Sequence, residues 1–173
     1  MNNKYSSKTI TCLICITIIS FTWCFGQNNK SDNKFAWVNL GFGGSSGGFS
    51  VGINGSYQFR YHIISLRTLY NAEWSLTSTP DESGDIGLLY GLSSKKKKTF
   101  VSISTGISRV VGSINTHSKE MDYVTLGIPI ELQLFLTGKQ FGIGIYGFAN
   151  INRESSFVGA LFCIQLGKLR ESK

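Results

Sequence analysis

The residues that could support hydrolytic chemistry are few and lie far apart in the chain. A serine nucleophile needs a histidine base and an acid that point the same way. The chain has two histidines, His62 and His117, and both lie at the ends of expected strands or in loops. Neither has neighbouring ligands at the spacing of a metal site. The sequence therefore predicts no catalytic residue, no metal site and no cofactor.

Two other motifs have simpler interpretations than a ligand site. Residues 41–48 are rich in glycine, but they lie between expected strands and lack the lysine of a phosphate-binding loop, which opens a helix. We interpret them as a flexible hairpin loop. Asp81, Glu82 and Asp85 could bind calcium weakly, and we interpret them as part of a solvated loop.

The amino-terminal segment has the pattern of a secretory signal peptide. Lys4 and Lys8 give a basic start, residues 10–19 form a short apolar run, and small residues follow near position 26. We expect residues 1–26 to be cleaved on export, with an uncleaved anchor as the alternative. A second alternative makes Cys24 a lipidated cysteine, although Trp23 is far larger than the small residue normally needed before it.

Loss of the signal peptide changes the cysteine and charge content. Three cysteines leave with it, so Cys163 remains alone and no intramolecular disulfide can form. We interpret Cys163 as a small buried or lipid-facing apolar residue. The net charge falls from +7 to +5, and the run Lys95–Lys98 holds four of the cations. We predict a solvated turn there that could contact anionic lipid, and no nucleic-acid partner.

The rest of the chain has the period-two pattern of β-strands. Residues 48–61 show it most clearly, with apolar and aromatic residues at odd positions and polar or small ones at even positions. The same alternation begins again at seven other points: Phe35, Ile64, Ile86, Val101, Val124, Phe141 and Val158. This pattern predicts an all-β domain over residues 34–169, with a disordered lead at 27–33 and a polar tail at 170–173.

The connections favour an eight-stranded antiparallel up-and-down meander barrel. Short joints near 60–62, 93–98 and 137–139 tend to alternate with polar loops. The four expected loops are Gly43–Gly47, Thr77–Gly84, Gly112–Met121 and Asn152–Ser155. Long loops at one end and tight turns at the other are the plan of outer-membrane barrels.

Three features favour lipid around this barrel over water. The face opposite the apolar one is rich in Gly and Ser with few charges, most expected strands are long enough to cross a bilayer, and aromatic residues gather near strand ends. We expect the interior to hold a polar network made of Arg60, Arg67, Glu73, Asp85, Glu131 and Gln133. We expect the membrane interfaces to hold the aromatic residues Tyr57, Phe59, Tyr61, Tyr70, Trp74 and Tyr123.

The chain resembles the small outer-membrane β-barrel proteins of Gram-negative bacteria. The resemblance rests on the signal peptide, the eight alternating segments, residues 123–132 with their Ile-Pro-Ile core, and the closing residues 157–169. It implies an outer-membrane location, contact with membrane lipid and insertion by the barrel-assembly machinery. It implies no enzyme activity, and favours a structural or surface-interaction role through Thr77–Gly84 and Gly112–Met121.

Two other functions stay open from the sequence. A soluble exported barrel could bind a small apolar ligand, because the same alternation would then line an internal cavity. A narrow conduit could run through the barrel beside the interior charges.

Overall fold

The computed structural model describes most of the predicted barrel domain. The described residues are 34–73, 82–96, 98–116 and 119–169, without the side chains of 114–116, 119 and 120. Parts of the sequence predictions therefore lie outside them: residues 1–33, Trp74, Lys97, His117 and residues 170–173. Of the expected loop Thr77–Gly84, residues 77–81 with Asp81 lie outside them, and the prediction was wrong for its last three residues because β4 begins at Glu82. No helix in the described ranges is long and apolar enough to cross a membrane.

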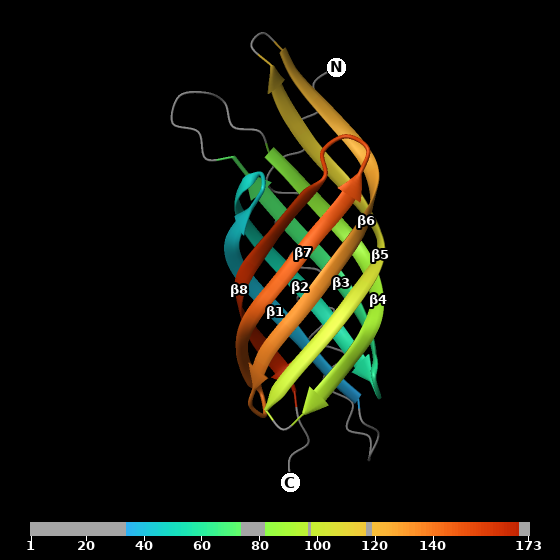
Figure 1. Cartoon of the computed structure of the whole chain (residues 1–173), viewed down its shortest axis with the longest axis vertical. Helices are drawn as coiled ribbons and strands as arrows, with labels where there is room; N and C mark the ends of the chain where they lie inside the picture. Colours follow the sequence, from blue (N-terminus) through green and yellow to red (C-terminus); the bar gives the residue numbers. More distant parts are fainter. Residues whose placement is uncertain (1–33, 74–81, 97, 117–118, 170–173) are drawn as a thin grey trace. The chain divides into compact units, whose positions relative to one another are not determined.

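Eight antiparallel strands close into a barrel, which confirms the predicted fold (Figure 1). In chain order they are β1 (Lys34–Ser45), β2 (Gly48–Phe59), β3 (His62–Ala72), β4 (Glu82–Lys96), β5 (Thr99–Thr116), β6 (Lys119–Thr137), β7 (Phe141–Asn152) and β8 (Phe157–Lys168). Each strand pairs with the next in the chain, and β1 pairs with β8 to close the sheet. Closure removes the open sheet edge that an apolar environment does not tolerate.

The side chains alternate between the interior and the exterior along each strand. In β3, Arg67 and its odd-numbered neighbours are buried, whereas Ile64, Leu66 and Tyr70 are exposed. Successive strand residues point to opposite faces, so the apolar set found from periodicity faces outward. This is the reverse of a soluble barrel, in which the apolar face points inward.

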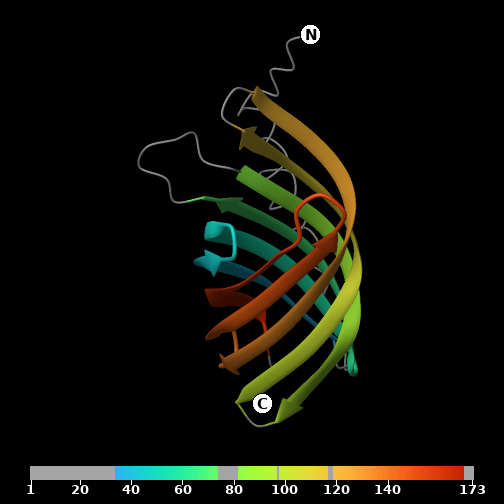
Figure 2. The same cartoon turned by 45° about the horizontal axis from the view of Figure 1, so that its top comes forward.

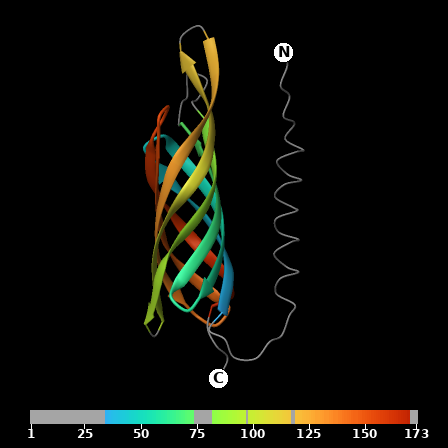
Figure 3. The ribbon, with the colours of Figure 1, turned by 90° about the vertical axis from the view of Figure 1, so that its right-hand side faces the viewer.

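Strands β5 and β6 rise beyond the rest of the barrel as a two-stranded hairpin (Figures 2 and 3). Their pairing continues from Gly112↔Tyr123 to Thr116↔Lys119. The prediction of a polar loop over Gly112–Met121 was therefore wrong. Polar residues did not end the strands, because each backbone here finds hydrogen-bonding partners on the other strand of the hairpin.

The three short joints predicted from the sequence lie at one end of the barrel, and the other connections, including the two-residue turn Ser46–Gly47, lie at the opposite end. We call the end with the joints at 60–61, 97–98 and 138–140 the terminal end, because β1 starts and β8 finishes there. The opposite end is the loop end. At the terminal end Arg60 has a positive φ of 57°, a left-handed conformation that closes the β2–β3 turn. At the loop end Gly48 begins β2 with φ 110°. The loop predicted at 41–48 was too long, because β1 continues to Ser45 and only Ser46 and Gly47 form the turn.

Candidate functional site

The centre of the barrel holds a buried ion pair between two neighbouring strands. Arg67 on β3 donates from Nη2 to Oδ2 of Asp85 on β4 at 2.5 Å, and neither side chain is exposed. Asp85 Oδ2 also accepts from Asn150 Nδ2 at 2.7 Å, and Asn150 donates to Ser108 Oγ at 2.8 Å. The pair thus connects β3 and β4 with β5 and β7. A charge in such a place is tolerated only when it is paired and hydrogen-bonded.

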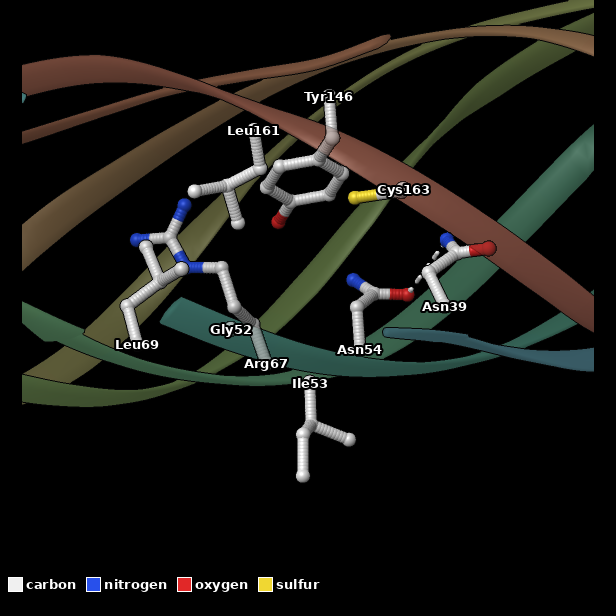
Figure 4. Close-up of a pocket in the computed structure, with 9 residues that line it drawn as sticks. All are labelled: Asn39, Gly52, Ile53, Asn54, Arg67, Leu69, Tyr146, Leu161 and Cys163. Atoms are coloured by element: carbon white, nitrogen blue, oxygen red, sulfur yellow. Dashed lines mark hydrogen bonds between the residues drawn. The ribbon is translucent and has the colours of Figure 1, made fainter. Parts of the chain in front are cut away.

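A second buried acid, Glu131 on β6, organises the neighbouring part of the interior. Its Oε2 accepts from Asn54 Nδ2 at 3.2 Å and from the Tyr146 hydroxyl, and its Oε1 accepts from Gln133 Nε2 at 3.1 Å. Asn39 on β1 donates to Gln133 Oε1 at 3.1 Å. Figure 4 shows the Tyr146 hydroxyl pointing toward the Arg67 guanidinium, which brings the two ionic centres together.

Apolar side chains fill the interior on either side of this polar centre. Toward the terminal end Trp37 and Phe100 meet edge to face at 5.0 Å, and both are almost completely buried. Toward the loop end Phe148 and Phe157 meet edge to face at 6.2 Å. Eight strands give an interior that side chains just fill, and these aromatic pairs do so at both ends.

A cavity beside this polar centre has a volume of about 10 Å³. It is lined by Asn39, Gly52, Ile53, Asn54, Arg67, Leu69, Tyr146, Leu161 and Cys163 (Figure 4). A volume of this size holds about one water molecule. It therefore offers no room for a substrate, and Cys163 is buried beside it as a small apolar residue.

Four residues of the expected polar network lie in the interior and two do not. Arg67, Asp85, Glu131 and Gln133 are buried there. Arg60 is exposed in the β2–β3 turn, and Glu73 is exposed just after β3 ends. Those two expectations were wrong because strict alternation stops where a strand stops.

Other members of the network were missed by the sequence reasoning. Asn39, Asn54, Tyr146 and Asn150 are all buried and hydrogen-bonded inside the barrel. Each has the parity of the polar face on its strand, so period-two spacing could have found them. Tyr146 was not predicted as a network member because its ring is aromatic, and aromatic residues were assigned to the apolar face.

Of the aromatic residues expected at the membrane interfaces, most lie on the outside of the barrel and one faces the interior. Tyr57, Tyr61 and Tyr70 are exposed on the outside, and Phe59 is half-buried there. Tyr123 instead packs against the interior apolar cluster, so its placement at the interface was wrong. Its odd number gives it the same inward parity as Glu131 on β6. Trp74 lies outside the described residues.

The outer surface carries an apolar zone that we call the outer belt, interrupted on β5 by the exposed Arg109 between Ile107 and Val111. It consists of the outward-facing apolar side chains of all eight strands. Its most exposed members include Phe42, Ile103, Ile107, Val124, Leu126 and Leu136. On β7 the belt runs from Phe141 to Ile151. Roughly ten residue steps of about 3.3 Å, tilted by about 40°, give it a height of roughly 25 Å, which is the height of the apolar band of outer-membrane barrels.

The residues considered for catalysis or metal binding do not form such a site where the structure describes them. His62 lies on the outside, where its ring stacks on Phe59 at 5.1 Å and its Nδ1 is 2.5 Å from the Tyr90 hydroxyl. No group of three or more His, Cys, Asp or Glu side chains suited to a metal ion occurs within the described ranges. Asp85 faces the interior, away from exposed Glu82.

Comparisons with solved structures show what this arrangement is similar to. The amino-terminal β-barrel domain of Pseudomonas aeruginosa OprF is 9% identical, with a TM-score of 0.59 over 80% of this chain and 99% of that one. Ail of Yersinia pestis is 9% identical, with a TM-score of 0.58 over 80% of this chain and 100% of that one. Neisserial surface protein A is 11% identical, with a TM-score of 0.54 over 78% of this chain and 94% of that one.

At these identities the likeness establishes the fold alone. No protein-family model matches the chain, and no curated protein sequence matches it. The sequence-based resemblance to small bacterial outer-membrane barrels is thus confirmed at the level of architecture.

Proposed function

We propose that this protein is an integral β-barrel of a bacterial outer membrane, exported with residues 1–26 as a cleaved signal peptide. The observation that carries the proposal is the outer belt, which surrounds a barrel whose centre is polar and ionic. A large apolar side chain loses roughly 1.5–3 kcal/mol of burial energy when it stays in water. Lipid around the belt would remove that cost for every member of it.

The role that the interior supports is structural and non-enzymatic. The Arg67–Asp85 pair, the Glu131 cluster and the aromatic pairs fill the space that a substrate or a water column would need. A conduit beside the interior charges is therefore less well supported. A soluble barrel with an apolar ligand is also less well supported, because the apolar side chains face outward rather than around a cavity.

The part that we propose for interaction with other molecules is the loop end. The β5–β6 hairpin rises there beyond the other strands (Figure 2). Its described outward residues include Asp122, and Glu73, Glu82 and Glu154 are exposed at the same end. Arg109 and Arg153 are exposed toward the same end, so four acids stand against two cations among its described side chains. This excess of negative charge favours basic or neutral polar partners over polyanions. Insertion by the barrel-assembly machinery is part of the same proposal.

The test is the location and thermal behaviour of the protein in a Gram-negative host. Envelopes are separated into soluble, inner-membrane and outer-membrane fractions, and each fraction is run on SDS gels with and without boiling. We expect the protein in the outer-membrane fraction, starting at residue 27, with a mobility that changes on boiling because a closed barrel resists SDS. Release into the periplasmic fraction without detergent would contradict the proposal.

A further inference from the structure

The exposed charges differ between the two ends of the barrel: the described charged side chains of the terminal end include only cations, whereas the loop end has four acids together with two cations, Arg109 and Arg153. The exposed acids with described side chains all lie at the loop end, and they are Glu73, Glu82, Asp122 and Glu154. The remaining described acids, Asp85 and Glu131, are buried inside. The terminal end carries six exposed cations in the described residues, and they are Lys34, Arg60, Lys96, Lys98, Lys139 and Lys168; a seventh, Lys95, is half-buried there with its ammonium over the Phe35 ring. Asp32 and Glu171 lie outside the described residues.

Several of these cations follow directly on the outer belt. On β8 the outward residue after Leu166 is Lys168, and both side chains are exposed. On β4 the outward series passes from Leu92 through Ser94 to Lys96. Because outward side chains recur at every second residue, these lysines lie within one or two outward positions of the last apolar side chain. A lysine there can extend its stem along apolar surface and present its ammonium at the edge.

One side of the terminal end brings three of these cations together. The register pairs Ala36 with Lys168, which makes Lys34 a diagonal neighbour of Lys168 on the same face. The Lys139 carbonyl in the β6–β7 turn accepts from the Leu169 amide at 3.0 Å, so this turn lies beside the end of β8.

The other side of the terminal end combines cations with aromatic rings. Tyr61 lies 4.1 Å from His62 between ring centroids, and His62 stacks on Phe59. Arg60 lies in the turn between these rings, and Lys96 lies on the neighbouring strand. Tyrosine rings beside basic residues are the arrangement that proteins use at membrane–water interfaces.

We propose that the terminal end of the barrel binds the head groups of anionic phospholipids, through Lys96, Lys98, Lys139 and Lys168 at the edge of the outer belt. This inference rests on the membrane insertion proposed above. The partner is membrane lipid rather than a soluble polyanion, because the lysines continue the outer belt and lipid that covers the belt would place its head groups beside them. In the outer-membrane plan the tight turns face the periplasm, so the lipid would belong to the inner leaflet.

The experiment measures lipid selectivity by electron paramagnetic resonance. The protein is purified from envelopes, reconstituted in phosphatidylcholine vesicles, and probed with trace spin-labelled phosphatidylglycerol or phosphatidylcholine. Two variants are compared with the parent: Lys96→Gln/Lys168→Gln at the terminal end and Arg109→Gln/Arg153→Gln toward the loop end, where Arg109 lies outward on β5 between Ile107 and Val111 and Arg153 follows β7. Both lose two positive charges from exposed side chains, so they differ in where the charge is removed.

We expect the parent to prefer spin-labelled phosphatidylglycerol about two-fold or more over phosphatidylcholine in its lipid shell, because each cation near a membrane surface strengthens anion binding roughly five-fold. The terminal-end variant should lose most of this preference, and the loop-end variant should keep it. The preference should also fall in about 1 M salt, where charges are screened beyond roughly 3 Å.

Three results would overturn the inference while leaving the membrane proposal intact. They are equal binding of both lipids by the parent, equal loss of preference in the two variants, and a preference that salt does not reduce. Each of these results is measured on protein that has inserted into the vesicles. Motionally restricted lipid and the gel shift on boiling show the insertion. Failure of the parent to insert into the phosphatidylcholine vesicles would instead contradict the proposed function itself.

Discussion

Breaking the central ion pair should destabilise the barrel strongly, and the change Arg67→Met tests this. Arg67 and Asp85 have no exposed side-chain surface, and their charged atoms are 2.5 Å apart. Without Arg67 the Asp85 carboxylate keeps one donor at Oδ2, the Asn150 amide at 2.7 Å, while Oδ1 has no hydrogen-bond partner in the described structure. A buried carboxylate would thus remain without its counter-charge.

The expected loss in the free energy of unfolding is about 3–5 kcal/mol, the cost of removing one partner of a buried pair. The double variant Arg67→Met/Asp85→Asn removes the stranded charge and keeps an amide of similar size near Asn150. We expect it to lose less than Arg67→Met alone, so that the coupling in the double-mutant cycle reaches about 2 kcal/mol or more. Neutral replacements of buried pairs commonly cost little for the same reason.

The assay is urea unfolding of the reconstituted protein in vesicles, followed by tryptophan fluorescence and analysed by linear extrapolation. Ser102→Ala is the matched control, because Ser102 is buried in the interior and its hydroxyl has no partner among the described residues. It should change the free energy of unfolding by less than about 1 kcal/mol. A loss of unfolding free energy below about 1 kcal/mol for Arg67→Met would refute a tightly packed ionic centre. So would a double variant whose loss equals the sum of the losses of the two single variants.

Three further predictions concern the belt, the backbone and the interior. Leu132→Arg, in the middle of the outward series of β6, should cost about 2–4 kcal/mol of unfolding free energy in vesicles. Leu126→Arg, at the loop-end edge of the outer belt, should cost about 1 kcal/mol or less. Similar costs for the two variants would contradict a belt of limited height. Gly167→Ala should lower the stability by about 1 kcal/mol or more, because φ is +147° and a Cβ would meet the backbone of β1. Gly147→Ala, where the nearest heavy atom to a Cβ is 3.8 Å away, should be close to neutral in the same urea titration. Cys163 should resist maleimide in the folded barrel and react after unfolding. Mass spectrometry of the peptide that contains Cys163 measures the label. Labelling of the folded protein would show that the interior is open.

Period-two spacing was enough to predict the strand number and which residues share a face. The spacing works because every second residue of a strand points the same way, and because the chain has few strong breaks in the pattern. The outward direction of the apolar face was inferred from other features: the few charges on the opposite face, the strand lengths and the aromatic residues near strand ends. The spacing places Arg67 and Asp85 on the face opposite the apolar one, and both side chains are buried in the interior. The pairing of these two side chains needs the register between β3 and β4, which no single segment contains.

The errors lie where local pattern and tertiary structure separate. Arg60 and Glu73 are at strand ends, so alternation no longer sets the direction of their side chains. The residues 112–121 have the composition of a loop, yet each strand there finds its hydrogen-bonding partner on the other. Tyr123 was judged by its aromatic type and its place near a strand start, although its parity points inward to the apolar cluster.

The most direct test of the account is whether the outer belt contacts hydrocarbon. Single spin labels at the outward β6 positions Ile128, Ile130, Leu132, Leu134 and Leu136 are measured in vesicles against oxygen, which concentrates in lipid, and a water-soluble nickel complex. We predict that oxygen collisions peak near Leu132 while nickel collisions fall to a minimum there, because this position lies within the belt. Frequent nickel collisions at all five positions would mean that the apolar face meets water, and the membrane barrel would be contradicted.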